Sequence, residues 1–170
     1  MNGMPEPWFL FCQAVETTAL HRFMSGTSWY FPAVETFHHI GMVLLVGSIS
    51  LFDLRLLGVA MKGQSVSRIA DRLLPATWAG FALMVLTGTL MFATSPLSGQ
   101  VYCPNKTFQL KLVLIGLAGL NMGVFHFTVY RRVGDWDKAE STPFGAKLVG
   151  SFSVLLWAGV VAAGRWIGFS

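Results

Sequence analysis

Ionisable side chains interrupt the first long apolar stretch of this chain, and their spacing places them along one face of a helix. Glu35 and Asp53 are separated by eighteen residues, which is about five turns, so both fall on one line of a helix. His38 and His39 lie within about 60° of that line, one on either side. Carboxyl and imidazole groups in this arrangement can relay protons or bind a metal ion.

A later apolar stretch carries a similar set of polar residues. Lys111 and His126 fall within about 60° of one line of a helix, together with Met122, and Asn121 flanks that line. Ionisable groups inside apolar helices are costly, so each marks a candidate functional position. The residues that we expect to form a buried polar network between the two stretches are Glu35, Asp53, Lys111 and Asn121.

The composition indicates what surrounds these polar groups. Of the 170 residues, 54% are hydrophobic and 12% are charged, whereas soluble domains average about 25% charged residues. The mean hydropathy of +0.58 points the same way. These values exclude a disordered chain, a nucleic-acid-binding protein and most soluble enzymes, and they predict an integral membrane protein that is surrounded by the lipid bilayer.

Four stretches are apolar and long enough to cross a membrane as helices, which takes about 20 residues each. They cover approximately residues 32–61, 75–96, 108–130 and 144–167. We therefore predict an all-α fold, an integral membrane four-helix bundle that forms a single membrane domain over residues 1–170. The segment of about 7–24 has apolar residues at helical spacing and lacks the basic start of a signal peptide, so we expect an N-terminal amphipathic interfacial helix there.

Basic residues are distributed unevenly between the two sides of this bundle. Seven fall in or beside the first and third loops, namely Lys62, Arg68, Arg72, Arg131, Arg132, Lys138 and Lys147. Three fall on the other side, namely Arg22, Lys106 and Arg165. Because Lys and Arg accumulate in cytoplasmic loops, we expect both termini on the periplasmic side of a bacterial inner membrane. Arg55, near the inner end of the first span, is expected to reach the membrane surface.

The two cysteines, Cys12 and Cys103, both fall on the predicted periplasmic side. Disulfides persist in that oxidising compartment. The sequence does not give the separation of the two residues in space, so a disulfide and two unpaired thiols both remain open.

With this orientation, the polar residues separate into two layers by depth. The outer layer holds Glu35, His38, His39 and Lys111, and the inner layer holds Asp53 and His126. His38 and His126 differ in depth by about 20 Å at the helical rise. They are therefore too far apart to bind opposite faces of one haem iron.

Histidines on the helices of a bundle suggest haem b as a cofactor, with copper as the alternative. His38 and His126 are the candidate haem or metal ligands, each in its own layer. The candidates for a second ligand beside His38 are His39, His21 and Met91. A copper site would use His38, His39 and a nearby methionine.

The same residues also have purely structural interpretations. Glu35 could pair with Lys111, and Asp53 with His126 or Arg55, as ion pairs that fix one helix against another. Met91 could simply fill the core. The glycines that we expect to form a close contact with a neighbouring helix are Gly116, Gly119 and Gly123.

Three strings in the chain resemble a bacterial family of small four-span membrane proteins of unknown function, and together they cover approximately Trp29 to His126. The most specific pieces are E-x-x-H at Glu35 and His38, D-L-R-L-L-G from Asp53, and the set Lys111, Asn121 and His126. His39 is outside this pattern. The architecture also resembles small b-type cytochromes and copper-resistance D-like proteins, which implies histidine ligands for haem or metal by analogy.

Three functions remain open at this stage. The first is a membrane redox protein that binds b-type haem and passes electrons between the quinone pool and a periplasmic partner. The second is a proton or metal transport module that uses the two polar layers. The third is a non-catalytic accessory or assembly subunit within a homo-oligomer or a larger membrane complex. The chain has no C-x-x-C-H, nucleotide-binding loop or H-E-x-x-H motif, so enzymatic activity is also left open.

Overall fold

The structure is a computed structural model that describes residues 6–19, 21–22, 27–94, 102–137, 139 and 141–169. Its long helices are α3 (Tyr30–Leu56), α4 (Val66–Thr94), α5 (Lys106–Val124) and α7 (Phe144–Trp166). Each lies in an apolar helical stretch long enough to cross a membrane. This confirms the predicted all-α four-helix bundle and makes the chain a multi-pass membrane protein.

The third apolar stretch extends past its predicted end at residue 130. After α5 the chain continues without a break through the π-helical turn η2 (Phe125–Val129), the 3-10 turn η3 (Tyr130–Arg132) and the short helix α6 (Val133–Trp136). At the C-terminus, the 3-10 turn η4 (Ile167–Phe169) prolongs α7. The predicted start of α7 near residue 144 is correct.

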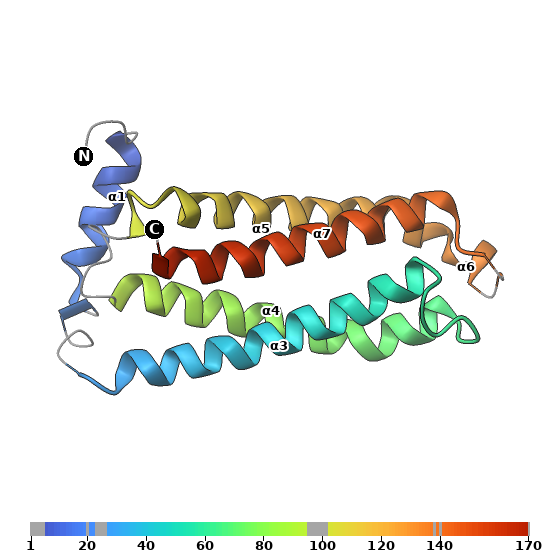
Figure 1. The fold of residues 1–170 in the computed structure, drawn as a ribbon, viewed down its shortest axis with the longest axis horizontal. Helices are drawn as coiled ribbons and strands as arrows, with labels where there is room; N and C mark the ends of the chain where they lie inside the picture. The colour runs from blue at the N-terminus through green and yellow to red at the C-terminus, as the bar shows by residue number, and fades with distance from the viewer. Residues whose placement is uncertain are drawn as a thin grey trace.

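The N-terminal helix α1 (Glu6–Glu16) lies across one end of the bundle (Figure 1), the arrangement expected of a surface helix. It ends at Glu16 rather than near residue 24. The Thr17 and Thr18 hydroxyls each bond back to a backbone carbonyl three residues earlier, at 2.8 Å in both cases. Such bonds offer the backbone an alternative to helical pairing. Helical residues resume at 19, 21 and 22.

The four long helices form two antiparallel pairs, α3 with α4 and α5 with α7, and the pairs meet chiefly where α3 packs on α7 (Figure 1). The order around the bundle is therefore α4, α3, α7 and α5, and the first and last helices are not among the principal packing pairs. We call the end that carries α1 the disulfide end, and the opposite end, with residues 57–65 and α6, the loop end.

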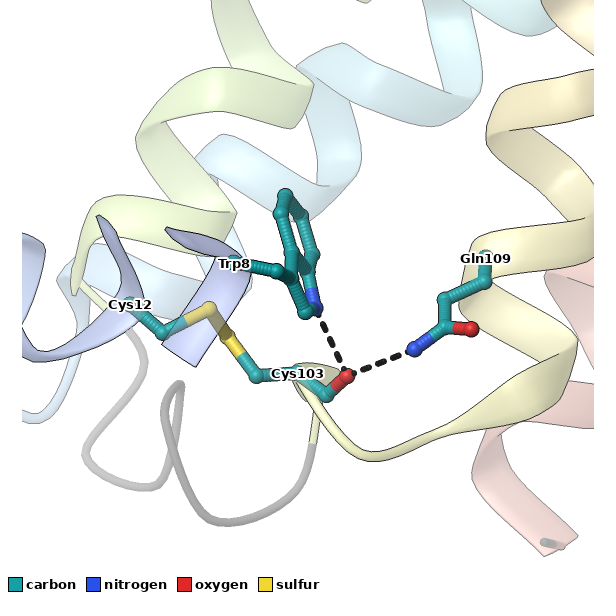
Figure 2. Close-up of a disulfide and its surroundings, with 4 residues drawn as sticks. All are labelled: Trp8, Cys12, Cys103 and Gln109. Carbon is teal, nitrogen blue, oxygen red and sulfur yellow. Dashed lines mark hydrogen bonds between the residues drawn. A yellow bond between two sulfur atoms is a disulfide. The ribbon is translucent and has the colours of Figure 1, made fainter. Parts of the chain in front are cut away.

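A disulfide joins Cys12 of α1 to Cys103, with Cα atoms 6.4 Å apart. The Trp8 indole and the Gln109 amide both donate to the Cys103 carbonyl oxygen, each at 3.0 Å (Figure 2). Aromatic rings stack beside this bridge, including the pair Phe92 and Phe108 at 5.5 Å between ring centroids. Because these two rings come from α4 and α5, the stack holds those helices together at the disulfide end.

At the loop end, α3 stops at Leu56 instead of continuing to residue 61. Gly58 has a φ of +72°, a left-handed conformation that terminates a helix and suits glycine. Arg55 does not reach the surface as predicted, because it is only 3% exposed. Its Nε donates to the Gln64 carbonyl at 3.0 Å, and its Nη1 donates to the Thr142 hydroxyl at 3.3 Å. Arg55 therefore connects the end of α3 to the loop that contains Gln64 and to Thr142 before α7.

Helix α4 begins at Val66, well before the predicted start at Pro75. The Asp137 carboxylate accepts from the Ser67 backbone N–H and hydroxyl, each at 2.7 Å. A carboxylate is favourable at this helix end, where the first N–H groups lack helical partners. The first turns are also held by burial of Val66 and Ile69. Pro75 lies inside the helix with its ring exposed.

Close helix contacts occur at glycines other than the predicted ones. A Cβ on Gly80 would lie 2.6 Å from the backbone nitrogen of Leu45, so α4 crosses α3 there almost backbone to backbone. Around Gly116, Gly119 and Gly123, no atom of the described residues lies within 4 Å of such a Cβ. These three glycines therefore make no close contact with the described helices of this chain, because their face of α5 points away from α7.

We predict that Gly80→Ala destabilises the fold, because the added methyl group meets backbone that cannot move aside as a side chain can. The free energy of unfolding should fall by about 1–3 kcal/mol. The matched control is Gly116→Ala, where the methyl group enters open space and alanine favours the helix. Thermal unfolding in detergent micelles measures both variants, and equal midpoints would contradict the close crossing.

We also predict that reducing the disulfide loosens α1 and lowers the thermal midpoint. The bridge closes a sequence separation of 91 residues, and native disulfides typically stabilise by about 2–4 kcal/mol. The double variant Cys12→Ser, Cys103→Ser should match the reduced protein and be insensitive to reductant. Alkylation of the unreduced protein should label no cysteine. Labelling of either cysteine, or an unchanged midpoint on reduction, would count against the bridge.

Candidate functional site

A cavity of about 230 Å³ lies inside the bundle, mainly in the half nearer the loop end. Side chains of all four long helices and of η2 line it. Trp78 of α4 lines the cavity and is 57% exposed. Gly119 of α5 also both lines the cavity and is exposed. The α4 and α5 walls of the cavity therefore include residues that reach the outer surface of the bundle.

The walls of the cavity are largely apolar and rich in rings. The aromatic residues among them are Phe52, Trp78, Phe81, Phe125, Tyr130 and Trp157. The polar and ionisable residues are Asp53, Thr77, Asn121, His126, Tyr130 and Ser153. A pocket with this balance binds an apolar ligand and uses a few polar groups to orient it.

Asp53 is the acidic residue of this cavity, and it is 2% exposed. Ser153 of α7 interacts with its carboxyl group. The oxygen Oδ2 is buried and has no hydrogen-bond partner among the described residues. Burying a polar atom without a partner costs about 1–3 kcal/mol, and more for a charged one. The predicted ion pairs of Asp53 with Arg55 or His126 do not form, since Arg55 bonds to the loop and His126 is exposed.

Asn121 of α5 reaches across to α7, where its amide nitrogen donates to the Val149 carbonyl at 3.1 Å. A carbonyl can only accept, so this bond fixes which end of the amide faces α7. The amide oxygen of Asn121 is left for the cavity. Asn121 and Asp53 line one site, as predicted, although their helices, α5 and α3, are not a principal packing pair.

His126 lies in the π-helical turn η2, a local widening that often occurs at functional sites. Its ring stacks on Tyr130 at 5.8 Å between centroids, with an interplanar angle of 19°. Both rings line the loop-end part of the cavity. The side chain of His126 is exposed on its other side.

His38 lies in a different place, against α4 towards the disulfide end. Its Nδ1 is 2.8 Å from the Thr87 hydroxyl, and that hydroxyl donates its own proton to the Leu83 carbonyl at 2.6 Å. Nδ1 therefore carries the proton and donates to Thr87, which leaves the lone pair of Nε2 free. Metal-binding histidines commonly have this arrangement.

The two other predicted histidine ligands bond to backbone carbonyls, and Met91 lies one helical turn after Thr87. His39 is exposed, and its Nδ1 donates to the Glu35 carbonyl of its own helix at 2.9 Å. His21 donates from Nδ1 to the Ala93 carbonyl at 2.9 Å. Met91 is half-buried on α4. Among the residues that the structure describes, no group of three or more His, Cys, Asp or Glu could hold a metal ion.

The predicted ion pair of Glu35 with Lys111 does not form within the described part of the chain. Lys111 packs against α7 instead, where its Nζ would lie 3.3 Å from a Cβ built on Gly164. The reason is the order of the helices, because α5 pairs with α7 and α3 pairs with α4. The buried network predicted from Glu35, Asp53, Lys111 and Asn121 is therefore reduced to Asp53 and Asn121.

Two features of the site were missed by the sequence analysis. Ser153 lies in the fourth apolar stretch, and a lone serine there is not unusual. One sequence signal exists, because Ser153 shares a helical face with the buried residues Gly150 and Trp157. The π-helical turn around His126 has no such signal, since its sequence continues the apolar pattern.

Comparisons with known proteins place the chain in a family but do not give it an activity. No curated protein and no solved structure matches it. The model of one family, described as a family of unknown function (DUF6644), matches residues 15–170. That match covers all four apolar helices and every residue of the candidate site. The chain therefore belongs to this family of unknown function, DUF6644.

Proposed function

We propose that this chain binds a lipid-soluble quinone or quinol in the cavity and serves electron transfer in the membrane. The observation that carries the proposal is the unpartnered Asp53 carboxyl oxygen in the wall of an apolar, ring-lined cavity. A buried acid inside a membrane protein is expensive unless it has a use. A ligand with an apolar ring can pack against the aromatic walls, and a polar substituent on that ring can hydrogen-bond to Asp53.

The position of the cavity supports a ligand that arrives from the bilayer. α4 and α5 are held together by the Phe92 and Phe108 stack at the disulfide end, and we propose that the cavity opens to the lipid between them further along. Trp78 and Gly119 form the two sides of this opening. Because Gly119 has no side chain, it leaves room for the flat ring of a ligand to pass. A water-soluble substrate has no comparable route to this site.

The chemistry that the residues can perform is proton exchange with the bound ring. An ionised Asp53 can accept a proton from a quinol hydroxyl, and a protonated Asp53 can return one. His126 and Tyr130 lie on the loop-end side of the same cavity and can hand protons towards the loops. Electrons leave or reach the ring through a redox partner, which we propose to be another protein of the membrane.

The orientation that we propose places the disulfide end at the periplasmic face of a bacterial inner membrane. Two independent features support it. The disulfide of Cys12 and Cys103 belongs in an oxidising compartment, and the opposite end carries most of the basic loop residues, as cytoplasmic ends do. Asp53 and His126 would then lie in the cytoplasmic half of the membrane.

We expect decylubiquinone to quench the tryptophan fluorescence of the protein in lipid nanodiscs, because Trp78 and Trp157 line the cavity. Asp53→Asn keeps the shape of the side chain but removes its charge, and Asp53→Leu also removes its hydrogen bonding. Both variants should change the affinity for the quinone or quinol. Asp53→Leu should weaken binding by about tenfold or more. Saturable quenching in the wild type is the first readout.

The matched control is Asp135→Asn, which changes an exposed acid on α6, outside the cavity. It should bind as the wild type does. Quenching that never saturates would count against a quinone site at Asp53. So would an equal change of affinity in Asp53→Asn and in Asp135→Asn. An accessory subunit without a ligand would give quenching that never saturates.

A b-type haem ligated by His38 is a second candidate, favoured by the free Nε2 of this histidine. His38 supplies one ligand nitrogen, and the two other predicted histidines, His21 and His39, bond to backbone carbonyls instead. Met91, a second copy of the chain or a partner subunit would have to complete a doubly ligated haem. For this reason no step of the proposed function depends on haem.

The absorption spectrum of protein expressed with ample haem tests this candidate. A Soret band that is lost in His38→Ala and kept in His39→Ala would support ligation by His38, since the exposed neighbour serves as the control. Protein without a Soret band, before and after dithionite, would rule the haem out.

A further inference from the structure

We infer that the cavity selects the reduced, hydroxyl-bearing form of its ligand, a quinol, over the oxidised quinone. This inference rests on the proposed function and concerns which redox form the site recognises. Its basis is that, with Asp53 ionised, the free polar atoms on the two sides of the cavity, the oxygens of Asp53 and Asn121, both accept hydrogen bonds. A quinol hydroxyl can donate to them, whereas a quinone carbonyl cannot.

The carboxyl group of Asp53 is fixed by its surroundings. Ser153, which is 6% exposed, interacts with it from α7. The remaining oxygen, Oδ2, is left without a partner among the described residues while it lines the cavity wall. An ionised carboxylate offers acceptor sites only. A ligand must therefore bring a donor to this atom or leave it unsatisfied.

Asn121 contributes the second acceptor. One hydrogen of its amide nitrogen donates to the Val149 carbonyl of α7, and the other can donate to a quinol oxygen as well as to a quinone oxygen. Rotating the amide would place its oxygen against that carbonyl, with two acceptors facing each other. The orientation is thus enforced by the backbone of α7, and the oxygen end remains for a ligand.

The Tyr130 hydroxyl lines the cavity and can donate to a quinol oxygen as well as to a quinone oxygen, so it does not favour the quinone. The hydroxyls of Thr77 and its neighbour Ser48 are used within the helices. Thr77 donates its proton to the Leu73 carbonyl at 3.0 Å, and its oxygen is 2.8 Å from the Ser48 hydroxyl. Ser48 in turn lies 2.6 Å from the Leu44 carbonyl. Each hydroxyl has a single proton, and these protons serve acceptors within α3 and α4.

Ring N–H groups that line the cavity, such as the indoles of Trp78 and Trp157, do not reverse this preference. A quinol oxygen can accept from them as well as a quinone oxygen can. What differs between the two ligands is the hydrogen that the quinol adds, and only that hydrogen satisfies Asp53 or Asn121. A site built to bind a hydroxyl group rejects an analogue that lacks it, because its own buried groups stay unpaired.

Titration calorimetry of the protein in nanodiscs, under anaerobic conditions, tests the inference with decylubiquinol and decylubiquinone as probes. We expect the wild type, at a pH high enough to ionise Asp53, to bind the quinol about tenfold or more tightly than the quinone. Asp53→Asn replaces an acceptor by an amide that can donate to a carbonyl, so the preference should shrink or reverse. Asp135→Asn, the exposed control, should keep the wild-type ratio.

The outcomes separate the inference from the function on which it rests. If the wild type binds both forms equally, or binds the quinone more tightly, the preference is overturned while the quinone site stands. If neither form binds, both are overturned. The wild-type ratio is decisive by itself if Asp53→Asn does not fold, and the helical circular dichroism of each variant shows whether it has.

Discussion

A carboxyl oxygen held between apolar helices without a hydrogen-bond partner is the constraint on which the rest of this structure depends. Asp53 is buried in an apolar span, and none of the residues that the structure describes donates a hydrogen bond to its Oδ2. The cost of this unpaired oxygen persists because the packing around it is held firmly from both ends. A ligand that donates to Asp53 would recover part of the cost, which links the stability of the bundle to binding.

The two ends of the bundle hold this arrangement in different ways. At the disulfide end, a covalent bridge (Figure 2) joins α1 to the segment before α5, and stacked rings bring α1, α4 and the start of α5 together. At the loop end, Asp137 caps α4 and Arg55 ties α3 to the loops on either side. Between these ends, the cavity is lined by side chains of all four long helices.

The sequence predicts much of this fold because the bilayer imposes simple rules. Apolar length alone gives the four spans, and the scarcity of charge identifies Asp53 as an unusual residue. The errors lie where a single contact decides a boundary, as at Gly58 and at the Asp137 cap that starts α4 early. Such contacts join residues that are distant along the chain, so no local pattern reveals them.

The candidate site was predictable by residue type but not by partner. Asp53 and His126, which were assigned to one inner layer, line one cavity together with Asn121, whereas the expected pair of Lys111 and Glu35 does not form among the described residues. That pairing assumed that α3 lies beside α5, but helical periodicity gives the face of a helix and not its neighbour. The actual order, with α7 between α3 and α5, also explains why Ser153 was missed.

Photoaffinity labelling with an azido-quinol, followed by mass spectrometry of the labelled peptides, tests the central claim most directly. The claim predicts label on residues that line the cavity, in the part of α4 around Trp78 and in α5 and η2 around Asn121 and His126, with labelling prevented by excess unlabelled quinol. Label confined to the disulfide end, or label that excess quinol does not displace, would contradict it.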